Sequence, residues 1–389
     1  MVAAGRRAEE GAGTVRIAIV GPTHPYKGGV AQHTTELAHR LAAAGATVSL
    51  ESWSAQYPAL LYPGQQRVDT PELPLFPRTS YPLSWRRPDG WLRLGRRLRR
   101  TSDAVVLVLV SPVQAPALAT IERAVGAASG RLVLCHNVLP HERRRIDERL
   151  VRMVLRSADA VLVHAQPERE RAEMLTAAPV SVASLPPPHR FPAGHLAPVD
   201  RPERRVLLFF GMVRPYKGLD ILLRALAQGP PDVRLVVAGE FWGGSAATEK
   251  LIAELGIADR VDLRPGYVPA AAVPGLFGGA DALVLPYRNS TASWNGSLGH
   301  EHGMPVVATR VGTMGEQVRD GVDGLLCLPE DVDDLAGALR RLYEPGVLAR
   351  LRAGVRPTDA DGQWDTYVDA VRAALGAGAG GDGPAERSL

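Results

Sequence analysis

The sequence predicts an α/β protein with two domains, each built on a parallel sheet. Apolar, strand-like runs alternate with helical segments in both halves of the chain, and this alternation is typical of parallel sheets with right-handed crossovers. The length of 389 residues exceeds what one ordinary hydrophobic core accommodates. A segment rich in proline and arginine, without a periodic apolar face, separates the halves at residues 186–205.

The first half shows this alternation from its start. The apolar run Val15–Val20 predicts a buried strand, and Ala31–Gly45 predicts a helix that ends at a glycine. Uninterrupted apolar runs are typical of parallel strands covered on both faces. By the same pattern, further strands are predicted at Thr47–Leu50, Ala104–Val110, Arg131–Cys135 and Ala160–Val163.

The second half repeats the pattern. A strand is predicted at Val206–Phe210, followed by the turn Gly211–Gly218 and a helix from Leu219. Further strands are predicted at Arg234–Glu240, Ala282–Tyr287 and Gly303–Thr309. Loops that follow parallel strands meet at one edge of a sheet, where ligands bind. Two such sheets that face each other place a cleft between their strand ends.

Composition narrows the class of protein. With 46% hydrophobic and 22% charged residues the chain is globular, and its net charge of +4 is too small to indicate a nucleic-acid partner. Cys135 and Cys327 lie in apolar, strand-like runs, which favours reduced thiols and a cytoplasmic location. No apolar run reaches the roughly 18 residues of a membrane-spanning helix, and Met1–Thr14 lacks the apolar stretch of a signal peptide.

These patterns give provisional domain boundaries. Residues 1–14 and 376–389 are small, charged or glycine-rich, so we expect disordered tails there. Between them we expect a first domain at 15–190, a linker at 191–205, a second domain at 206–360 and a C-terminal helix at 361–375.

A glycine-rich turn joins the first predicted strand to its helix. Gly28 and Gly29 allow the backbone to approach a phosphate, the helix N-terminus favours negative charge, and Lys27 adds a cation. The spacing differs from the GxGxxG dinucleotide fingerprint. A tight turn needed only for packing explains the two glycines equally well.

Two histidines of the first half are candidates for ligand contact. His136 follows the predicted strand 131–135, where its imidazole can donate to a hydroxyl or phosphate oxygen. His33 lies one helical turn beyond the glycine pair. A structural histidine with satisfied hydrogen bonds is the alternative for both positions.

Arg214 and Lys217 share the loop after the strand 206–210. A fixed pair of cations can stabilise the charge that grows on a departing diphosphate. Cations at the start of a helix oppose its macrodipole, so an anionic ligand explains them better than an ordinary charged surface does.

Taken in order, these segments resemble the retaining glycosyltransferases of family four, which have the GT-B fold of two Rossmann-like domains facing each other across a cleft. The resemblance spans nearly the whole of the chain that we expect to be ordered. It rests on Gly28-Gly29-Val30, His136-Asn137, Gly211–Gly218, Val237–Glu240, Gly303–Gly312 with Glu316, and Asp320–Leu326.

The resemblance implies transfer of a sugar from a UDP-sugar or GDP-sugar to an acceptor hydroxyl, with retention of anomeric configuration and without an obligatory metal or other cofactor. It places His136, Arg214 and Lys217 in the catalytic machinery, with His136 orienting the transferred sugar. The donor would lie mainly in the second domain. The donor-binding residues it implies are Gly28, Gly29, Glu240, Val268, Ser293, Asn295, Gly296, Ser297 and Glu301.

The chain departs from the family pattern at two places. The paired glutamates that the family carries eight positions apart correspond here to Ser290 and Leu298. The arginine that usually follows the loop glycine is replaced by Met212, and Arg214 can restore its charge two residues later. Glu301 lies one helical turn beyond Leu298, from where it could reach the ribose hydroxyls.

The acceptor would bind mainly in the first domain, where the polar and aromatic segment 52–58 can shape a pocket. The acceptor-binding candidates are His33, Trp53, Gln56 and Tyr57. The acceptor could be a glycan, a lipid-linked precursor or a small natural product. A helical stretch carries Arg93, Arg96, Arg97 and Arg100 on one side. Such a basic side suits peripheral contact with the inner face of an anionic membrane. A solvated arginine face over a core helix is the alternative.

Two other function classes fit the same pattern. The missing glutamates suit a GT-B protein that binds a nucleotide sugar without transferring it. Another GT-B enzyme, an epimerase or a phosphorylase, is the second alternative. An epimerase would need carboxylates for acid–base chemistry in the cleft, and the sequence offers few candidates.

Overall fold

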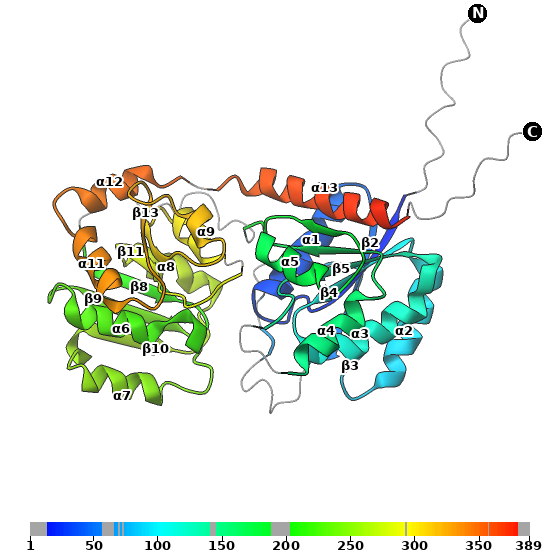
Figure 1. Cartoon of the computed structure of the whole chain (residues 1–389), viewed down its shortest axis with the longest axis horizontal. Coiled ribbons are helices and arrows are strands. Elements are labelled where there is room, and N and C mark those ends of the chain that lie inside the picture. The colour runs from blue at the N-terminus through cyan, green and yellow to red at the C-terminus, as the bar shows by residue number, and fades with distance from the viewer. Residues whose placement is uncertain are drawn as a thin grey trace, which may run out of the picture. The chain divides into compact units, whose positions relative to one another are not determined.

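The protein is described by a computed structural model that covers residues 14–56, 66–68, 71, 74–140, 145–187, 203–291, 294–356 and 358–379. It forms two compact units. Unit 1 comprises Met1–Ala183 and Asp365–Leu389, and unit 2 comprises Ser184–Trp364. Each unit is a sheet with helices packed against it (Figure 1).

Unit 1 contains a seven-stranded sheet with the strand order β3-β2-β1-β4-β5-β6-β7. All neighbouring strands are parallel. The strands are β1 Arg16–Val20, β2 Thr47–Ala55, β3 Thr79–Ser84, β4 Ala104–Leu109, β5 Gly130–Cys135, β6 Ala160–Val163 and β7 Val180–Val182.

The helices of unit 1 connect these strands, and one more comes from the end of the chain. They are α1 Gly29–Ala43, α2 Pro88–Thr101, α3 Ala115–Val125, α4 Asp147–Leu155 and α5 Gln166–Glu173, with the short helices η1 Pro112–Gln114 and η2 Gly126–Ala128. The last helix, α13, spans Ala360–Ala379, and its residues from Asp365 onward belong to unit 1.

Unit 2 contains a six-stranded sheet with the order β10-β9-β8-β11-β12-β13, again all parallel. The strands are β8 Val206–Phe210, β9 Arg234–Gly239, β10 Val261–Pro265, β11 Ala282–Leu285, β12 Val306–Thr309 and β13 Gly324–Cys327. The helices are η3 Pro215–Lys217, α6 Leu219–Gln228, α7 Ala246–Glu254, η4 Ala258–Arg260, η5 Ala270–Ala272, α8 Val273–Gly278, α9 Asn295–Glu301, α10 Met314–Gln317, α11 Val332–Leu342 and α12 Val347–Gly354.

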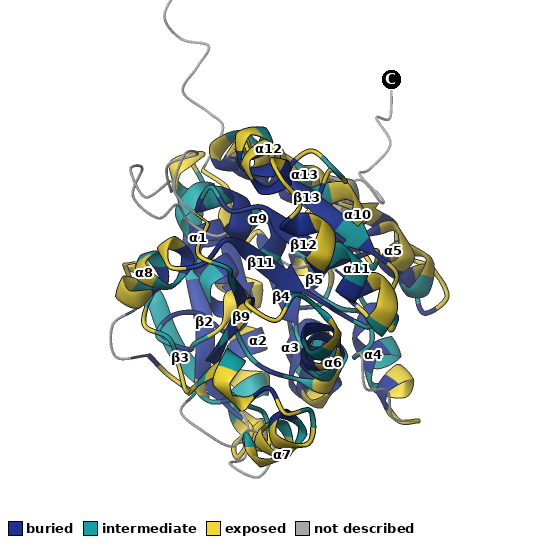
Figure 2. Cartoon of the chain, turned by 90° about the vertical axis from the view of Figure 1, so that its left-hand side faces the viewer, coloured by how far each residue is buried: buried dark blue, intermediate teal, exposed yellow. Residues whose placement is uncertain are grey.

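Both faces of the second sheet are covered, and the β8 sequence shows why. Leu207 and Phe209 belong to one apolar cluster, whereas Leu208 belongs to another. Successive side chains of a strand point to opposite faces, so an uninterrupted apolar strand supplies two cores. Figure 2 shows the same layering as dark-blue, buried strands beneath helices whose outer faces are exposed.

One buried ion pair joins several elements of unit 2. Asp281 is fully buried and lies 2.6 Å from the guanidinium of Arg352, which is also buried. The Asp281 carboxylate also accepts hydrogen bonds from the backbone N–H groups of Arg204 (2.9 Å) and Val206 (3.3 Å) and from the Tyr343 hydroxyl (3.3 Å). This carboxylate therefore connects the start of β8 to α12 and to the end of α11.

The α/β fold class with two parallel sheets is confirmed. The last helix begins at Ala360 and continues to Ala379, so residues 376–379 are helical and the expectation of a disordered tail from 376 onward is wrong for them. The rest of the expected tails, residues 1–13 and 380–389, and most of the expected linker lie outside the described residues. The division after Ala183 precedes that linker, and the C-terminal helix joins unit 1 from Asp365 onward.

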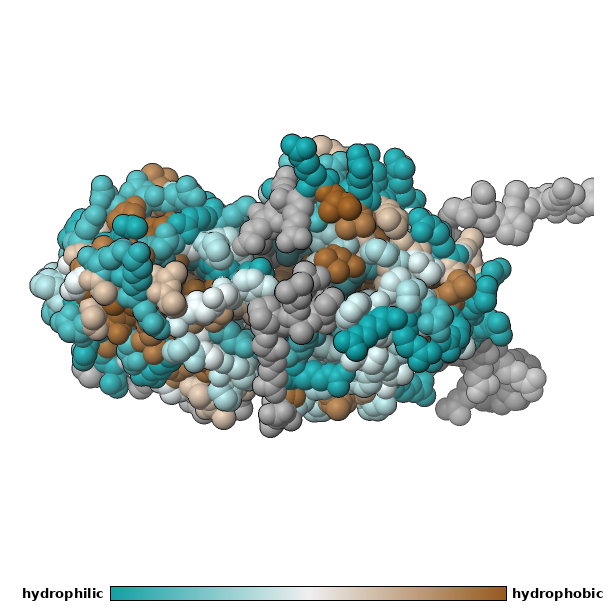
Figure 3. Space-filling model, turned by 90° about the horizontal axis from the view of Figure 1, so that it is seen from below, coloured by the Kyte–Doolittle hydropathy of each residue, from teal (hydrophilic) through white to brown (hydrophobic). Residues whose placement is uncertain are grey.

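On the face shown in Figure 3, hydrophilic side chains predominate and apolar ones form small, separate groups. Within the described ranges no helix has the length and apolar character needed to cross a membrane. Cys135 and Cys327 are buried and are not joined to each other.

Candidate functional site

The turn after β8 is held against the loop after β11. Gly211 has φ 99° and Gly218 has φ 67°, both in the region that favours glycine. A side chain at Gly218 would collide with the carbonyl of Pro286, so only glycine allows this close approach. Between these glycines, Pro215–Lys217 forms the 3₁₀ turn that presents Lys217.

The structure brings Lys217 and Asn295 together beside Gly211. A Cβ atom added at Gly211 would lie 3.5 Å from Lys217 Nζ and 3.6 Å from Asn295 Nδ2. The Asn295 amide donates to the Tyr287 hydroxyl (2.8 Å) and to the carbonyl of Phe210 (3.3 Å). Lys217 Nζ lies 5.4 Å from the centre of the Tyr287 ring, within reach of a cation–π contact.

Arg214 is held on a second aromatic ring. Its guanidinium carbon lies 4.3 Å from the centre of the Trp242 ring. Within the described ranges neither Arg214 nor Lys217 forms an ion pair with a carboxylate. Burial lowers the pKa of Lys217, and the neighbouring charge of Arg214 lowers it further. Two adjacent cations without a carboxylate partner form a site suited to an anion.

Arg288 fixes the turn that carries these cations. Its backbone N–H donates to the carbonyl of Tyr216 (2.8 Å), and its guanidinium donates to the carbonyl of Pro215 (2.6 Å). The guanidinium also forms a bidentate pair with Asp220, at 2.8 and 2.6 Å. Arg288 therefore joins the loop after β11 to the 3₁₀ turn and to the first turn of α6.

The residues at the start of α9 lie close to this turn through Asn295. Gly296 is buried and Ser297 is half-buried in the first turn of the helix, whereas Ser293 lies outside the described residues. Leu298, at a position where the family usually has glutamate, is buried in an apolar cluster. Glu301 accepts a hydrogen bond from the backbone N–H of Thr358 at 2.8 Å. One carboxylate oxygen thus already has a protein partner.

If Glu301 also contacts the ribose, Glu301→Ala should weaken binding of UDP or GDP by about 1–3 kcal/mol, the cost of leaving a polar group unpaired. Isothermal titration calorimetry measures the change. An unchanged affinity combined with a lower melting temperature would show that Glu301 only holds Thr358.

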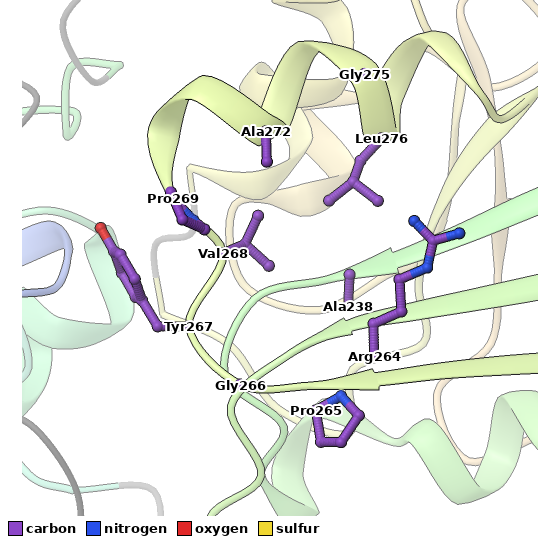
Figure 4. Close-up of a pocket in the computed structure, with 10 residues that line it drawn as sticks. All are labelled: Ala238, Arg264, Pro265, Gly266, Tyr267, Val268, Pro269, Ala272, Gly275 and Leu276. Carbon is purple, nitrogen blue, oxygen red and sulfur yellow. The ribbon is translucent and has the colours of Figure 1, made fainter.

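A pocket of about 460 Å³ opens at the carboxyl ends of β9 and β10, beside α8. Figure 4 shows the side chains of Ala238, Val268 and Leu276 turned toward one another, with Arg264 along one side. Val268 therefore lies where a flat, largely apolar ligand can be held. Glu240 directly follows β9, and its carbonyl accepts the N–H of Val213 at 2.7 Å.

The glycine-rich turn of unit 1 lines a smaller cavity of about 150 Å³. Lys27, Gly28, Gly29 and Gln56 all contribute to its wall. Trp53, by contrast, is buried in the hydrophobic core of unit 1, which gives it a packing role. Tyr57 lies outside the described residues.

His33 and His136 meet in a buried aromatic cluster with His164 and Tyr367. The ring centres of His136 lie 4.9 Å from those of both His33 and His164, and Tyr367 lies 5.1 Å from His33. His164 Nδ1–H donates to the carbonyl oxygen of Ala183 at 3.1 Å. His136 Nε2 is buried and has no hydrogen-bond partner among the described residues.

Burial keeps all three imidazoles neutral. It lowers the pKa of His164 to about 4 and holds the pKa values of His33 and His136 well below their usual range. An ordinary histidine has a pKa of about 6.5. Below that pH the unfolded chain therefore binds protons at these imidazoles, and the folded state does not. This stabilisation is complete above pH 6.5 and is lost as the pH falls from 6.5 toward 4.

Replacing His33 with phenylalanine should make unit 1 less sensitive to acid, because it removes one of these titrating groups and keeps an aromatic ring. Between pH 7 and pH 5, the variant should lose about 1–2 kcal/mol less stability than the parent, at about 1.4 kcal/mol per pH unit and histidine. Urea unfolding at both pH values measures the difference.

The comparison of parent and variant cancels other titrations. One of these is the titration of Glu122. Burial raises the pKa of Glu122 to about 8, so its titration changes stability with pH in the opposite direction to that of the histidines. Equal loss of stability in the parent and the His33→Phe variant would contradict the assignment.

Sequence reasoning missed several residues of these sites. Arg288 was visible as a cation in the loop after a predicted strand, which was the available signal, and the contact of Trp242 with Arg214 had no signal in the sequence. His164 was visible at the end of a predicted strand. Tyr367 had no signal, because nothing in the sequence shows that the last helix packs on unit 1.

Two family profiles match the chain over most of its length. The profile described as Glycosyltransferase Family 4 matches residues 27–188, and that of Glycosyl transferases group 1 matches residues 204–345. A D-inositol 3-phosphate glycosyltransferase of Actinosynnema mirum is 31% identical over 268 residues, which cover 63% of each chain. The corresponding protein of Thermomonospora curvata is 38% identical over 177 residues, covering 42% of this chain and 41% of its own. The chain thus matches less than two thirds of the length of these relatives.

Solved structures share the fold across almost the whole chain. HepE of Anabaena, solved with UDP and glucose, superposes with a TM-score of 0.69 at 18% identity and covers 92% of this chain and 100% of its own. Sucrose-phosphate synthase from Thermosynechococcus elongatus gives a TM-score of 0.66 at 18% identity, with coverage of 93% and 95%. At this identity the likeness establishes the fold.

Proposed function

The chain belongs to glycosyltransferase family 4, and from this premise we propose that it transfers a sugar from a nucleoside-diphosphate sugar to an acceptor hydroxyl. The donor diphosphate binds at Arg214 and Lys217 in unit 2. The single observation that supports this most strongly is the pair of adjacent cations that rest on aromatic rings and have no carboxylate partner among the described residues.

The reaction retains the anomeric configuration in this proposal. The acceptor hydroxyl attacks on the face from which the diphosphate leaves, and a diphosphate oxygen takes its proton, so that no covalent enzyme intermediate forms. Arg214, Lys217 and the backbone amides at the start of α9 stabilise the charge on the departing diphosphate. His136 stays neutral and orients the sugar through its buried Nε2, which has no hydrogen-bond partner among the described residues.

The first test is nucleotide binding. A thermal-shift series with UDP, GDP, ADP and their glucose or mannose conjugates should single out one nucleotide, because a ligand at a hundred times its Kd adds about 2.7 kcal/mol of stability. Release of the nucleoside diphosphate from the matching sugar donor then measures turnover. Failure of all three nucleotides to raise the melting temperature would overturn the proposal.

The acceptor binds in unit 1 in this proposal, at the cavity that Gln56 lines together with Gly28 and Gly29, two glycines that the family resemblance assigns to the donor. Lys27 and the N-terminus of α1 suit an acceptor that carries an anionic group, and Gln56 can bind a hydroxyl. The name D-inositol 3-phosphate glycosyltransferase, given to relatives of this chain, describes an acceptor of this chemistry. A phosphorylated cyclitol is therefore the first acceptor to test, followed by a lipid-linked glycan.

A protein that binds a nucleotide sugar without transferring it is the second candidate. Leu298 occupies a position where the family usually has glutamate, and its side chain is buried in an apolar cluster. This position therefore offers no carboxylate to a ligand. Donor binding without sugar transfer or hydrolysis above background would favour this candidate.

Helix α2 supports a further element of the proposal, which is contact with an anionic membrane. Leu94 and Leu98 of α2 are buried. Arg93 pairs with Asp89, and Arg97 pairs with Glu51. Two arginines of the same helix, Arg96 and Arg100, are exposed and form no ion pair within the described ranges.

Reversing these two charges is the sharpest test of membrane contact. An arginine near an anionic surface contributes about 1 kcal/mol, so Arg96→Glu with Arg100→Glu should lower binding to vesicles rich in phosphatidylserine by roughly a hundredfold. Cosedimentation measures the binding, which should also fade as salt rises. The matched control reverses Arg224 and Arg350, two exposed arginines of unit 2. Equal cosedimentation of both variants with the vesicles would contradict the proposal that α2 binds a membrane.

A further inference from the structure

We propose that Trp242 is a positioning residue that fixes the guanidinium of Arg214 for contact with the donor diphosphate. This inference rests on the proposed function. In it, the loop after β9 orients a diphosphate-binding side chain that belongs to the loop after β8. Trp242 acts through Arg214 and has no contact of its own with the diphosphate.

The two loops are joined by backbone hydrogen bonds. Val213 donates to Glu240 at 2.7 Å, Trp242 donates to Val213 at 3.1 Å, and Val213 forms a parallel bridge with Phe241. The loops thus continue the pairing of β8 and β9 beyond the ends of the strands. The backbone of Trp242 is therefore fixed relative to that of Arg214. The Trp242 ring is thus carried by a segment that is hydrogen-bonded to the loop of Arg214.

The arginine needs such a support because no hydrogen bond or ion pair to another described residue holds its side chain. The Nε atom of Arg214 is buried and makes no hydrogen bond among the described residues. Its guanidinium carbon lies 4.3 Å from the Trp242 ring centre, which is short for a cation–π contact. A tryptophan face orients the planar guanidinium but uses none of its N–H donors. Those donors remain directed to a ligand, whereas a carboxylate in place of the ring would occupy them.

The extended backbone of Arg214 supports the same assignment. Arg214 has φ −136° and ψ 156°, so side chains alternate along this part of the loop. Val213 points into the apolar cluster of unit 2, and Arg214 is therefore directed away from that core. The Trp242 ring lies 4.3 Å from the guanidinium carbon of this side chain.

A double-mutant cycle tests this coupling. UDP and GDP are titrated into the parent, Trp242→Ala, Arg214→Ala and the double variant, and the nucleotide that binds the parent is used throughout. Trp242→Ala should weaken its binding about five- to tenfold, which corresponds to a partly desolvated cation–π contact. In the Arg214→Ala background the same change should alter affinity less than twofold. Trp242→Phe should restore most of the affinity, because phenylalanine keeps an aromatic face.

The other outcomes separate the two levels of the proposal. A fully additive cycle would mean that Trp242 contacts the nucleotide itself, and this would overturn the inference. If Arg214→Ala weakens nucleotide binding and Trp242→Ala does not, the inference is also overturned, but the proposed diphosphate site stands. A parent that binds neither UDP nor GDP, or an Arg214→Ala variant with parental affinity, would overturn the proposed diphosphate site. A nucleoside control, uridine or guanosine, should bind the parent and Trp242→Ala equally.

Discussion

Replacing Lys217 with alanine is expected to lower turnover of the sugar donor by roughly ten- to a thousandfold while the protein stays folded. The ammonium group lies beside Asn295 and above the Tyr287 ring, in a partly buried site where a positive charge acts strongly on a departing diphosphate. Release of the nucleoside diphosphate under saturating donor measures the effect on kcat.

Lys250 provides the matched control. It belongs to the same unit, is 79% exposed and pairs loosely with Glu254 at 3.6 Å on the surface of α7. Lys250→Ala should therefore keep parental turnover, and both variants should melt within a few degrees of the parent. If Lys217→Ala also keeps parental turnover, the assignment of this cation to the leaving group is wrong.

Removing the Asp281 carboxylate should cause the largest loss of stability of any change considered for unit 2. Asp281→Ala removes the carboxylate that pairs with the buried Arg352 guanidinium, and breaking a buried ion pair from one side costs about 3–5 kcal/mol. The backbone N–H groups of Arg204 and Val206 lose their acceptor as well. Urea unfolding of the purified protein measures the free energy.

An exposed pair gives the control for this prediction. Arg16 and Asp103 lie 2.6 Å apart in unit 1, and both side chains are about half exposed, at 48% and 47%. Asp103→Ala should therefore cost less than about 1 kcal/mol. A second comparison, Asp281→Ala with Arg352→Met, should recover part of the loss, because it also removes the buried charge of Arg352. Equal destabilisation by Asp281→Ala and Asp103→Ala would contradict the role assigned to the buried pair.

The interior strands could be predicted from the sequence because burial on both faces leaves a continuous apolar run. β4 has the sequence AVVLVL and all six of its residues are buried. Three of the four edge strands, β3, β7 and β10, lacked this signal. Only the last two residues of β3 and the first of β7 are buried, and β10 contains no buried residue. An edge strand packs and pairs on one side only, so its sequence tolerates polar residues and proline.

The candidate site could be predicted only where it follows a strand directly. Arg214, Lys217 and His136 became candidates because the ends of parallel strands define a binding edge, and their roles stay predictions. The support of these residues depends on contacts between distant parts of the chain, such as Arg288 with Pro215 and Tyr367 with His33. No periodicity or turn signal encodes such a pairing. The core position of Trp53 was missed for the same reason, since its aromatic and polar neighbours suggested a loop.

The return of the last helix to unit 1 reverses the usual order of assembly during synthesis. Domains generally fold as they leave the ribosome, the N-terminal one first. Here Tyr367 of α13 completes the cluster formed by His33 and His164, and unit 1 takes its last residues from Asp365 onward. Unit 2 is one continuous segment, so it can finish folding while the earlier-translated unit still waits for the end of the chain. A nascent chain that has emerged only as far as Trp364 would thus hold a complete second unit and an incomplete first one.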